Sequence, residues 1–115
     1  MVNIYEDLAE LNKPIYAEGA APTTLPNEYY TVSEDYTSTN LSADNEAQEY
    51  LYEFTLKWYT NDANTLYSGL DAAIEVLKKK HYILSGVGYY NHTYKETWFS
   101  RQIDVNKIEY LKEDK

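Results

Sequence analysis

The strongest constraint on the fold is an alternation of side-chain types between Ala47 and Tyr59. Alternate positions on one face are aromatic or aliphatic, namely Tyr50, Tyr52, Phe54, Leu56 and Trp58. The intervening positions are mixed and mostly polar, namely Glu49, Leu51, Glu53, Thr55, Lys57 and Tyr59. A period of two over this length is typical of a β-strand with one buried face. We therefore predict a strand whose aromatic row packs in the core.

A helix is expected directly after this strand. Its apolar side chains recur every three or four residues and form one stripe, made of Leu66, Leu70, Ala73, Ile74 and Leu77. Asn61 and Asp62 can cap its start, and the lysines from Lys78 to Lys80 suit the negative end of the helix dipole. Gly69 lies inside the pattern, where it is either tolerated or permits close approach to the sheet. We expect the stripe to cover the aromatic row.

The remaining segments predict a second helix and further strands. Asn3 can cap a short helix, with Glu6 in the capping-box position. The segments expected to form strands are Ile15 to Ala17, Glu28 to Tyr36, His81 to Tyr90 and Tyr94 to Val105. The element order is then α-β-β-β-α-β-β. This order predicts an α+β fold, with a mostly antiparallel sheet of four to five strands and two helices packed on one side.

The length of 115 residues suits a single domain over residues 1–115. A flexible loop is expected at about 37–46, because the stretch is rich in small polar residues. A frayed C-terminus is expected at about 108–115. Gly86 and Gly88 are expected to mark a bulge within a strand rather than a phosphate-binding loop.

Charge limits the classes of partner. Nineteen acidic and ten basic residues give a formal charge of −9 at pH 7, which repels phosphate backbones and disfavours specific nucleic-acid binding. No apolar run approaches the roughly 20 residues that span a bilayer, so a soluble, cytoplasmic protein without membrane contact is expected. The chain has no cysteine, which excludes disulfides, thiolate nucleophiles and cysteine-ligated metals.

Groups that could carry chemistry are few. His81 and His92 are the only imidazoles, and neither has the spacing of a metal-binding motif. The acidic pairs Glu34-Asp35 and Asp44 with Glu46 lack the spacing of a calcium loop. We therefore expect no catalytic, cofactor-binding or metal-binding residues, no cofactor and no enzymatic activity.

The fourteen tyrosines are more than a core of this size holds with satisfied hydroxyls. Tyrosine is enriched at protein interfaces, although ordinary β-propensity also favours it in strands, and both explanations stay open. The candidate assembly contacts are Tyr29, Tyr36, Leu41, Asp44, Glu49, Glu53, Tyr59, Tyr89, Tyr90 and Tyr94.

Several short segments together resemble a known family. They are Asn3-Ile4-Tyr5-Glu6, Lys13-Pro14-Ile15-Tyr16, Leu25-Pro26-Asn27-Glu28-Tyr29-Tyr30, and the strand from Tyr52 to Thr60 that leads into an acidic helix. The chain is similar to the small head-tail joining or tail-completion (tail terminator-like) proteins of long-tailed bacteriophages and prophages of Gram-positive bacteria. The similarity lies in these sequence segments and in the order of the expected helices and strands.

The resemblance implies a non-enzymatic morphogenesis protein. It would assemble with itself as a ring, six-fold by the resemblance, and contact phage tail-tube and head-connector proteins while DNA passes through. It would lie in the host bacterial cytoplasm during assembly and then at the head-tail junction of the virion. The alternative is a monomeric acidic binding module, such as a DNA-mimic inhibitor of a basic DNA-binding protein. Its carboxylates would be Glu28, Glu34, Asp35, Asp44, Glu46, Glu49 and Glu53.

Overall fold

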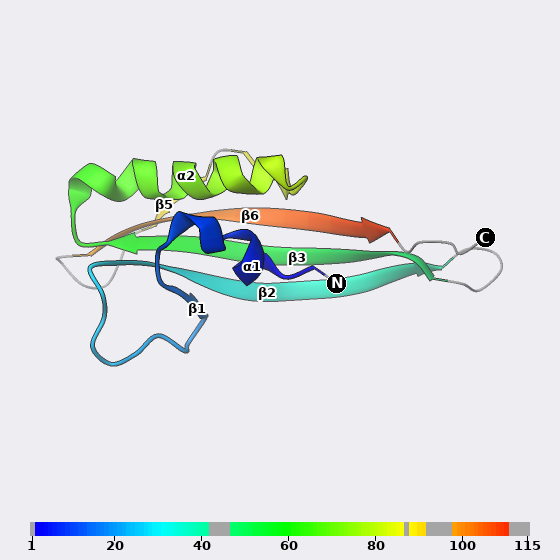
Figure 1. The fold of residues 1–115 in the computed structure, drawn as a ribbon, viewed down its shortest axis with the longest axis horizontal. Coiled ribbons are helices and arrows are strands. Elements are labelled where there is room, and N and C mark those ends of the chain that lie inside the picture. The colour runs from blue at the N-terminus through cyan, green and yellow to red at the C-terminus, as the bar shows by residue number, and fades with distance from the viewer. Residues whose placement is uncertain (1, 42–46, 87, 92–97, 111–115) are drawn as a thin grey trace.

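A computed structural model of the chain describes residues 2–41, 47–86, 88–91 and 98–110. Its elements follow the order α1 (Ile4–Asp7), the 3-10 helix η1 (Ala9–Leu11), β1 (Ile15–Ala17), β2 (Glu28–Leu41), β3 (Ala47–Thr60), the 3-10 helix η2 (Ala63–Thr65), α2 (Leu66–Lys79), β4 (Ile83–Leu84), β5 (Tyr89–Asn91) and β6 (Phe99–Tyr110). The expected α+β fold is confirmed (Figure 1).

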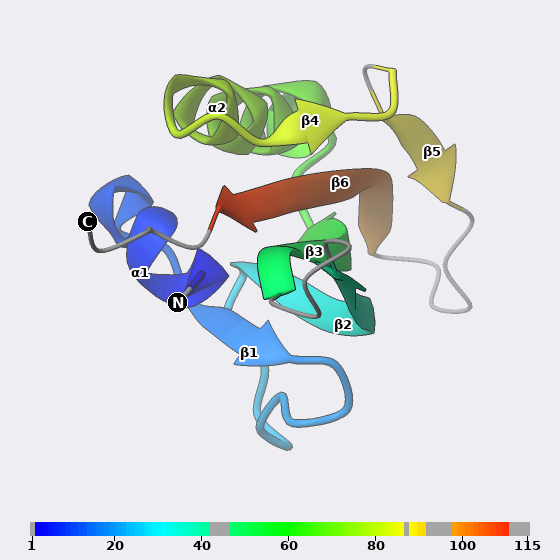
Figure 2. The same ribbon diagram turned by 90° about the vertical axis from the view of Figure 1, so that its right-hand side faces the viewer.

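The six described strands form one mixed sheet in the order β1-β2-β3-β6-β4, with β5 also paired to β6. The short strand β1 runs parallel to β2, and every other pairing is antiparallel. Both β4 and β5 lie on the side of β6 away from β3, since β6 pairs with β3 along its whole length. The sheet therefore has β1 and β2 at one edge and β4 and β5 at the other (Figure 2).

The alternation in β3 has the predicted result from Tyr52 to Trp58, whereas Tyr50, which was also expected in the core, is half-buried and lies outside the core cluster. Phe54, Leu56 and Trp58 are buried at 5%, 0% and 1% exposure, and Tyr52 is partly buried against the same core. Apolar residues of β2, β6 and both helices complete the core, including Val32, Ile103, Val105, Ile4, Leu8, Leu70, Ala73 and Leu77. Both helices thus cover the same face of the sheet, as expected. We call the opposite side the open face.

Gly69 brings α2 close to the sheet. A Cβ atom at this position would lie 1.9 Å from the indole of Trp58, so the glycine makes room for the ring. Of the two explanations for Gly69, close approach is confirmed. The helix α2 ends within the lysine run, as expected, with Lys79 as its last residue and Lys80 as its C-cap.

The N-terminal helix is capped as predicted, because the side-chain oxygen of Asn3 accepts hydrogen bonds from the backbone N–H groups of Tyr5 and Glu6. The helix is then held to the end of α2 by a long-range bond. The hydroxyl of Tyr82 donates to Asp7 at 2.6 Å. Burial of Tyr82, together with this bonded carboxylate, raises the pKa of its phenol.

The polar stretch expected as a loop from Thr37 is partly strand. Residues 37–41 continue β2, because they pair with β3 from Tyr52 down to Ala47, and residues 42–46 lie outside the described part. The prediction that the C-terminus is frayed from about residue 108 is also wrong for its first residues. Ile108 to Tyr110 extend β6 by pairing with β3. Residues 111–115 lie outside the described part.

These extensions make a three-stranded ribbon from the distal parts of β2, β3 and β6. Figure 1 shows it projecting beyond the end of α2, and the molecule measures 54 × 25 × 23 Å. We refer to residues 36–41, 47–53 and 106–110 as the ribbon.

The strand expected from His81 to Tyr90 is divided into β4 and β5. Gly86 and Gly88 have φ angles of 78° and 88°, which side-chain-bearing residues rarely adopt. Both lie after β4 ends at Leu84 and before β5 begins at Tyr89, so they fall between two strands instead of forming a bulge within one. The expected hairpin is present in the pairing of β5 with β6. β6 begins at Phe99. The turn expected at about residue 92 and the strand start expected at Tyr94 lie outside the described residues.

Candidate functional site

The described residues contain no group of three or more His, Asp or Glu side chains placed to hold a metal ion. His81 is exposed at the turn after α2, with a φ angle of 70°. His92, Asp44 and Glu46 lie outside the described residues.

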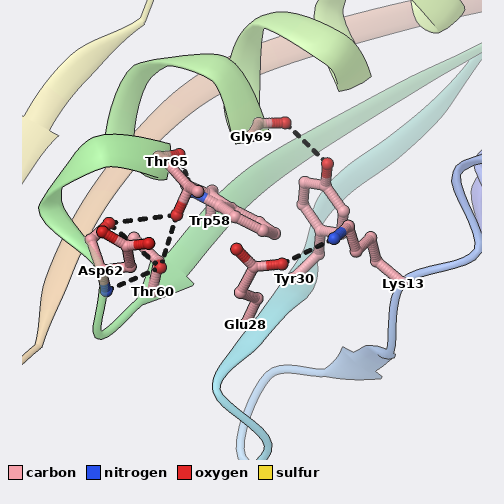
Figure 3. Close-up of polar contacts among 8 residues, drawn as sticks. All are labelled: Lys13, Glu28, Tyr30, Trp58, Thr60, Asp62, Thr65 and Gly69. Atoms are coloured by element: carbon pink, nitrogen blue, oxygen red, sulfur yellow. Dashed lines mark hydrogen bonds and ion pairs between the residues drawn. The ribbon is translucent and has the colours of Figure 1, made fainter.

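A polar network ties the start of α2 to β2 and β3 (Figure 3). The Tyr30 hydroxyl donates to the carbonyl of Gly69 at 2.6 Å, and the indole N–H of Trp58 donates to the carbonyl of Thr65 at 2.9 Å. Burial, with a smaller contribution from the charge of Glu28, raises the pKa of the Tyr30 phenol. The phenol therefore stays protonated as a donor, and the network holds the helix in place.

The turn between β3 and α2 belongs to the same network. The backbone N–H of Asp62 donates to the Thr60 hydroxyl at 3.0 Å, and that hydroxyl lies 2.7 Å from the hydroxyl of Thr65. The Asp62 carboxylate caps η2 by accepting from the N–H of Asn64 at 2.9 Å. These polar groups are satisfied within the chain, which indicates a structural role.

A cleft of about 460 Å³ lies beside this network. It is lined by Asn12, Lys13, Pro14, Pro26, Asn27, Glu28, Asn61 and Asp62. Lys13 and Glu28 form an ion pair at 2.6 Å within its lining, and Asn61 donates to the side chain of Asn27 at 3.1 Å. The ion pair neutralises two of the three charged groups in the lining, and the third, the Asp62 carboxylate, caps η2, so the cleft shows no concentration of charge that would select a ligand.

Tyr29, one of the candidate assembly contacts, is buried within the chain. It is only 7% exposed, because it packs on the open face against Tyr59 in a stacked geometry and against Tyr16 and Trp98 edge-on. The ring centroids lie 4.9 to 5.9 Å apart. Four sequence segments meet in this cluster, and Tyr59 is half-buried in it. The cluster covers the open face of the body and leaves Tyr29 little area for a partner.

Tyr89 and Tyr90 are exposed, at 51% and 43%, on the outer strand β5. The neighbouring outer strand β4 adds Ile83, which is 53% exposed and which sequence reasoning did not single out. The structure therefore brings three large apolar side chains to one edge of the sheet. We call this the β4–β5 edge. Apolar side chains on an outer strand are the feature expected of a protein contact.

The opposite edge is polar and acidic. Glu34, Asp35 and Thr37 are exposed on β2, where the register with β3 shifts between Glu34 and Tyr36. Asp35 accepts hydrogen bonds from the hydroxyls of Ser33 at 2.8 Å and Thr55 at 2.5 Å. We call the outer sides of β1 and β2 the β1–β2 edge.

The other predicted contacts are placed by the strand register alone or lie outside the described part. Tyr36, Leu41 and Glu49 are in the ribbon, where Tyr36 pairs with Glu53 and Leu41 with Ala47. Glu53 is half-buried in β3. Asp44 and Tyr94 lie outside the described residues.

Compared with known protein families and with curated proteins, the chain matches none. Within the described residues, no helix has the length and apolar character needed to cross a membrane.

Proposed function

We propose that this chain is a bacteriophage morphogenesis protein that completes the tail or joins it to the head. In this proposal copies form a ring at the junction between tail tube and head connector, and the chain works by contact rather than by turnover. The family resemblance in the sequence suggests the role, and the shape of the fold is compatible with it.

The ribbon is the observation that carries the proposal. It extends the sheet beyond the helices, and no further described strand pairs with the outer side of β2 over residues 33–41. Such strands bind other strands or protein surfaces rather than small molecules. The net charge of −9 also suits a channel through which DNA slides without sticking.

Particle assembly tests the proposal. Deleting the gene from its phage should leave separate full heads and finished tails in electron micrographs, and a plasmid copy should restore joined particles. The variant Thr37→Arg, at an exposed ribbon position, should fail to restore them, whereas Ser68→Arg, at an exposed position of α2, should succeed. Normal numbers of joined, infectious particles after the deletion would reject the proposal.

The open face favours one second candidate, an acidic module that binds a basic protein. Asp35 and Asp104 both lie within hydrogen-bonding distance of Thr55, at 2.5 and 3.1 Å, so two carboxylates meet on an exposed surface. Affinity capture separates the two functions. A joining protein should retain tail-tube or connector subunits, while a DNA mimic should retain a DNA-binding protein that salt releases.

A further inference from the structure

The outer side of β2 is open along the ribbon. β1 pairs with β2 only from Tyr30 to Val32, and the backbone N–H of Glu18, just after β1, donates to the carbonyl of Val32 at 2.8 Å. Figure 1 shows the chain after β1 turning back toward the start of β2, away from the ribbon. No further described strand pairs with this side of β2 over residues 33–41, which we call the free edge.

Strand pairing determines which backbone groups of the free edge point outward. In an antiparallel pair, every second residue directs its N–H and C=O groups to the neighbouring strand, and the others direct them away. The carbonyl of Val32 points toward β1, so the alternate residue Glu34 points the same way. The register shift between Glu34 and Tyr36 moves this phase by one residue, so Thr37 and Thr39 direct their backbone groups outward beyond it. The free edge therefore offers donors and acceptors to an added strand.

The distal part of the free edge lacks the usual protection against strand pairing. Natural edge strands are protected by charged side chains, prolines or bulges. The register shift and the charges of Glu34 and Asp35 provide such protection where the free edge begins. Residues 36–41 contain neither a charged residue nor a proline. The ribbon thus keeps an uncharged edge in a chain whose formal charge is −9.

A groove of about 400 Å³ adjoins the free edge on the helix-covered face of the sheet. It is lined by residues 2–5 at the start of α1, by Glu34 of β2, and by Tyr52 and Phe54 of β3. Glu34 belongs to both the groove and the free edge, and its carboxylate is the only charged group among the described lining residues. This carboxylate accepts a hydrogen bond from the Thr37 hydroxyl at 2.5 Å, and no ion pair between described residues includes it.

The free edge and the groove together fit an extended peptide. A strand added to β2 would bond to its outward backbone groups and would place every second side chain on the face that carries the groove. The rings of Tyr52 and Phe54 suit a large apolar side chain, and the Glu34 carboxylate suits a Lys or Arg beside it. A second copy of this chain fits less well, because the charge of −9 makes copies repel each other.

We propose that the free edge binds an extended segment of a partner protein as an added strand, and that the groove selects the side chains of this segment. The segment would carry a large apolar residue and a Lys or Arg two positions apart, so that both lie on the groove side. This site deepens the proposed function by describing how the ribbon would hold a neighbouring subunit, and it rests on that function only for the identity of the partner.

Selection from a random library of short displayed peptides tests the site. The purified chain is immobilised, bound peptides are enriched over successive rounds, and the affinity of each enriched peptide is then measured by fluorescence anisotropy. The enriched peptides should share a large apolar residue and a Lys or Arg two positions apart, and high salt should weaken their binding.

Two variants separate the contributions of the free edge and the groove. Thr37→Pro removes a backbone N–H that points outward and leaves the pairing with β3 in place, so it should weaken binding of the enriched peptides several-fold. Thr37→Val is the matched control, because it keeps this N–H and a β-branched side chain. Glu34→Lys reverses the charge in the groove, so selection against this variant should replace the cation by Asp or Glu.

Several results would overturn the proposal. These are the absence of enriched peptides, equal binding by the parent and Thr37→Pro, and equal losses in Thr37→Pro and Thr37→Val. Glu34 is exposed, so Glu34→Lys keeps the test decisive if Thr37→Pro fails to fold by circular dichroism, and an unchanged charge preference would count against the site.

Sedimentation of the chain alone tests the other occupant. A parent chain that sediments as a dimer, with Thr37→Pro as a monomer, would assign the free edge to a second copy and would also overturn the proposal. Peptide binding is measured without particle assembly. A chain that binds peptides as expected but is dispensable for joining heads to tails would therefore reject the proposed function alone.

Discussion

The indole of Trp58 fills the space where a side chain at Gly69 would lie, since a Cβ atom there would be 1.9 Å from the ring. Trp58 is 1% exposed and its N–H is bonded to the carbonyl of Thr65, so a shift of the ring would break this bond. One position on a helix and one on a strand therefore set the distance between the two layers.

Gly69→Ala should destabilise the protein although alanine is the better helix former. The gain in helix propensity is about 1 kcal/mol, while overpacking a core commonly costs about 1 to 3 kcal/mol. We expect a net loss of up to about 2 kcal/mol in the free energy of unfolding, measured by urea denaturation. The control Ser68→Ala, at an exposed position of the same turn, should be neutral or slightly stabilising.

The added methyl group acts through the ring, so a smaller residue at position 58 should compensate for it. Gly69→Ala combined with Trp58→Leu should be less destabilised than the sum of the two single variants. Strict additivity would contradict the packing relationship.

Tyr30→Phe should lower the free energy of unfolding by about 1 kcal/mol, because it removes a buried hydrogen bond and leaves the ring in place. The bond lost is the one to the Gly69 carbonyl at 2.6 Å. Tyr67→Phe is the matched control, because Tyr67 is 62% exposed. An equal effect from the two substitutions would argue against the network in Figure 3.

Alkaline pH should unfold the protein through its buried phenols. Burial raises the pKa values of Tyr30 and Tyr82 in the folded state above their ordinary value of 10.0. The unfolded chain therefore loses these protons first, so the stabilisation is complete below pH 10 and declines as the pH rises above it. Each phenol should contribute a slope of about 1.4 kcal/mol per pH unit.

Denaturant titrations at increasing pH measure this slope. The double variant Tyr30→Phe with Tyr82→Phe should show a shallower decline than the parent chain. An unchanged slope would mean that other groups cause the alkaline unfolding.

Asp62→Ala should lower the free energy of unfolding by about 1 kcal/mol through loss of a helix cap. The carboxylate accepts from the N–H of Asn64, so Asp62→Asn, which keeps an acceptor oxygen, should be close to the parent. Thermal melts of the two variants provide the comparison. Equal losses would assign the effect to charge instead of capping.

Local pattern was sufficient to predict the body of the fold. The period of two in β3 and the apolar stripe of α2 each identified a buried face, and the two faces pack on each other as expected. The cap at Asn3 and the lysines at the end of α2 likewise act within a single turn of chain. Features that depend on residues close together in the chain could therefore be predicted from the sequence.

The ribbon and the aromatic cluster could not be found in this way. Residues 37–41 have no apolar alternation, and they are strand because they pair with β3, which has its own strong pattern. Tyr29 is buried by Tyr16, Tyr59 and Trp98, which come from three other segments. Ile83 is exposed because its short strand is outermost in the sheet. Each of these depends on the strand order.

The far end of the ribbon lies beyond both described helices (Figure 1), so its backbone hydrogen bonds gain little protection from a buried layer. In the isolated chain, amide hydrogens of the ribbon should exchange with deuterium through local opening, well before those of Leu56 and Ile103, which are 0% exposed in the core. A partner that docks on the ribbon would slow this exchange without altering the core. Mass spectrometry of deuterium uptake would thus reveal when the protein has reached its place of assembly.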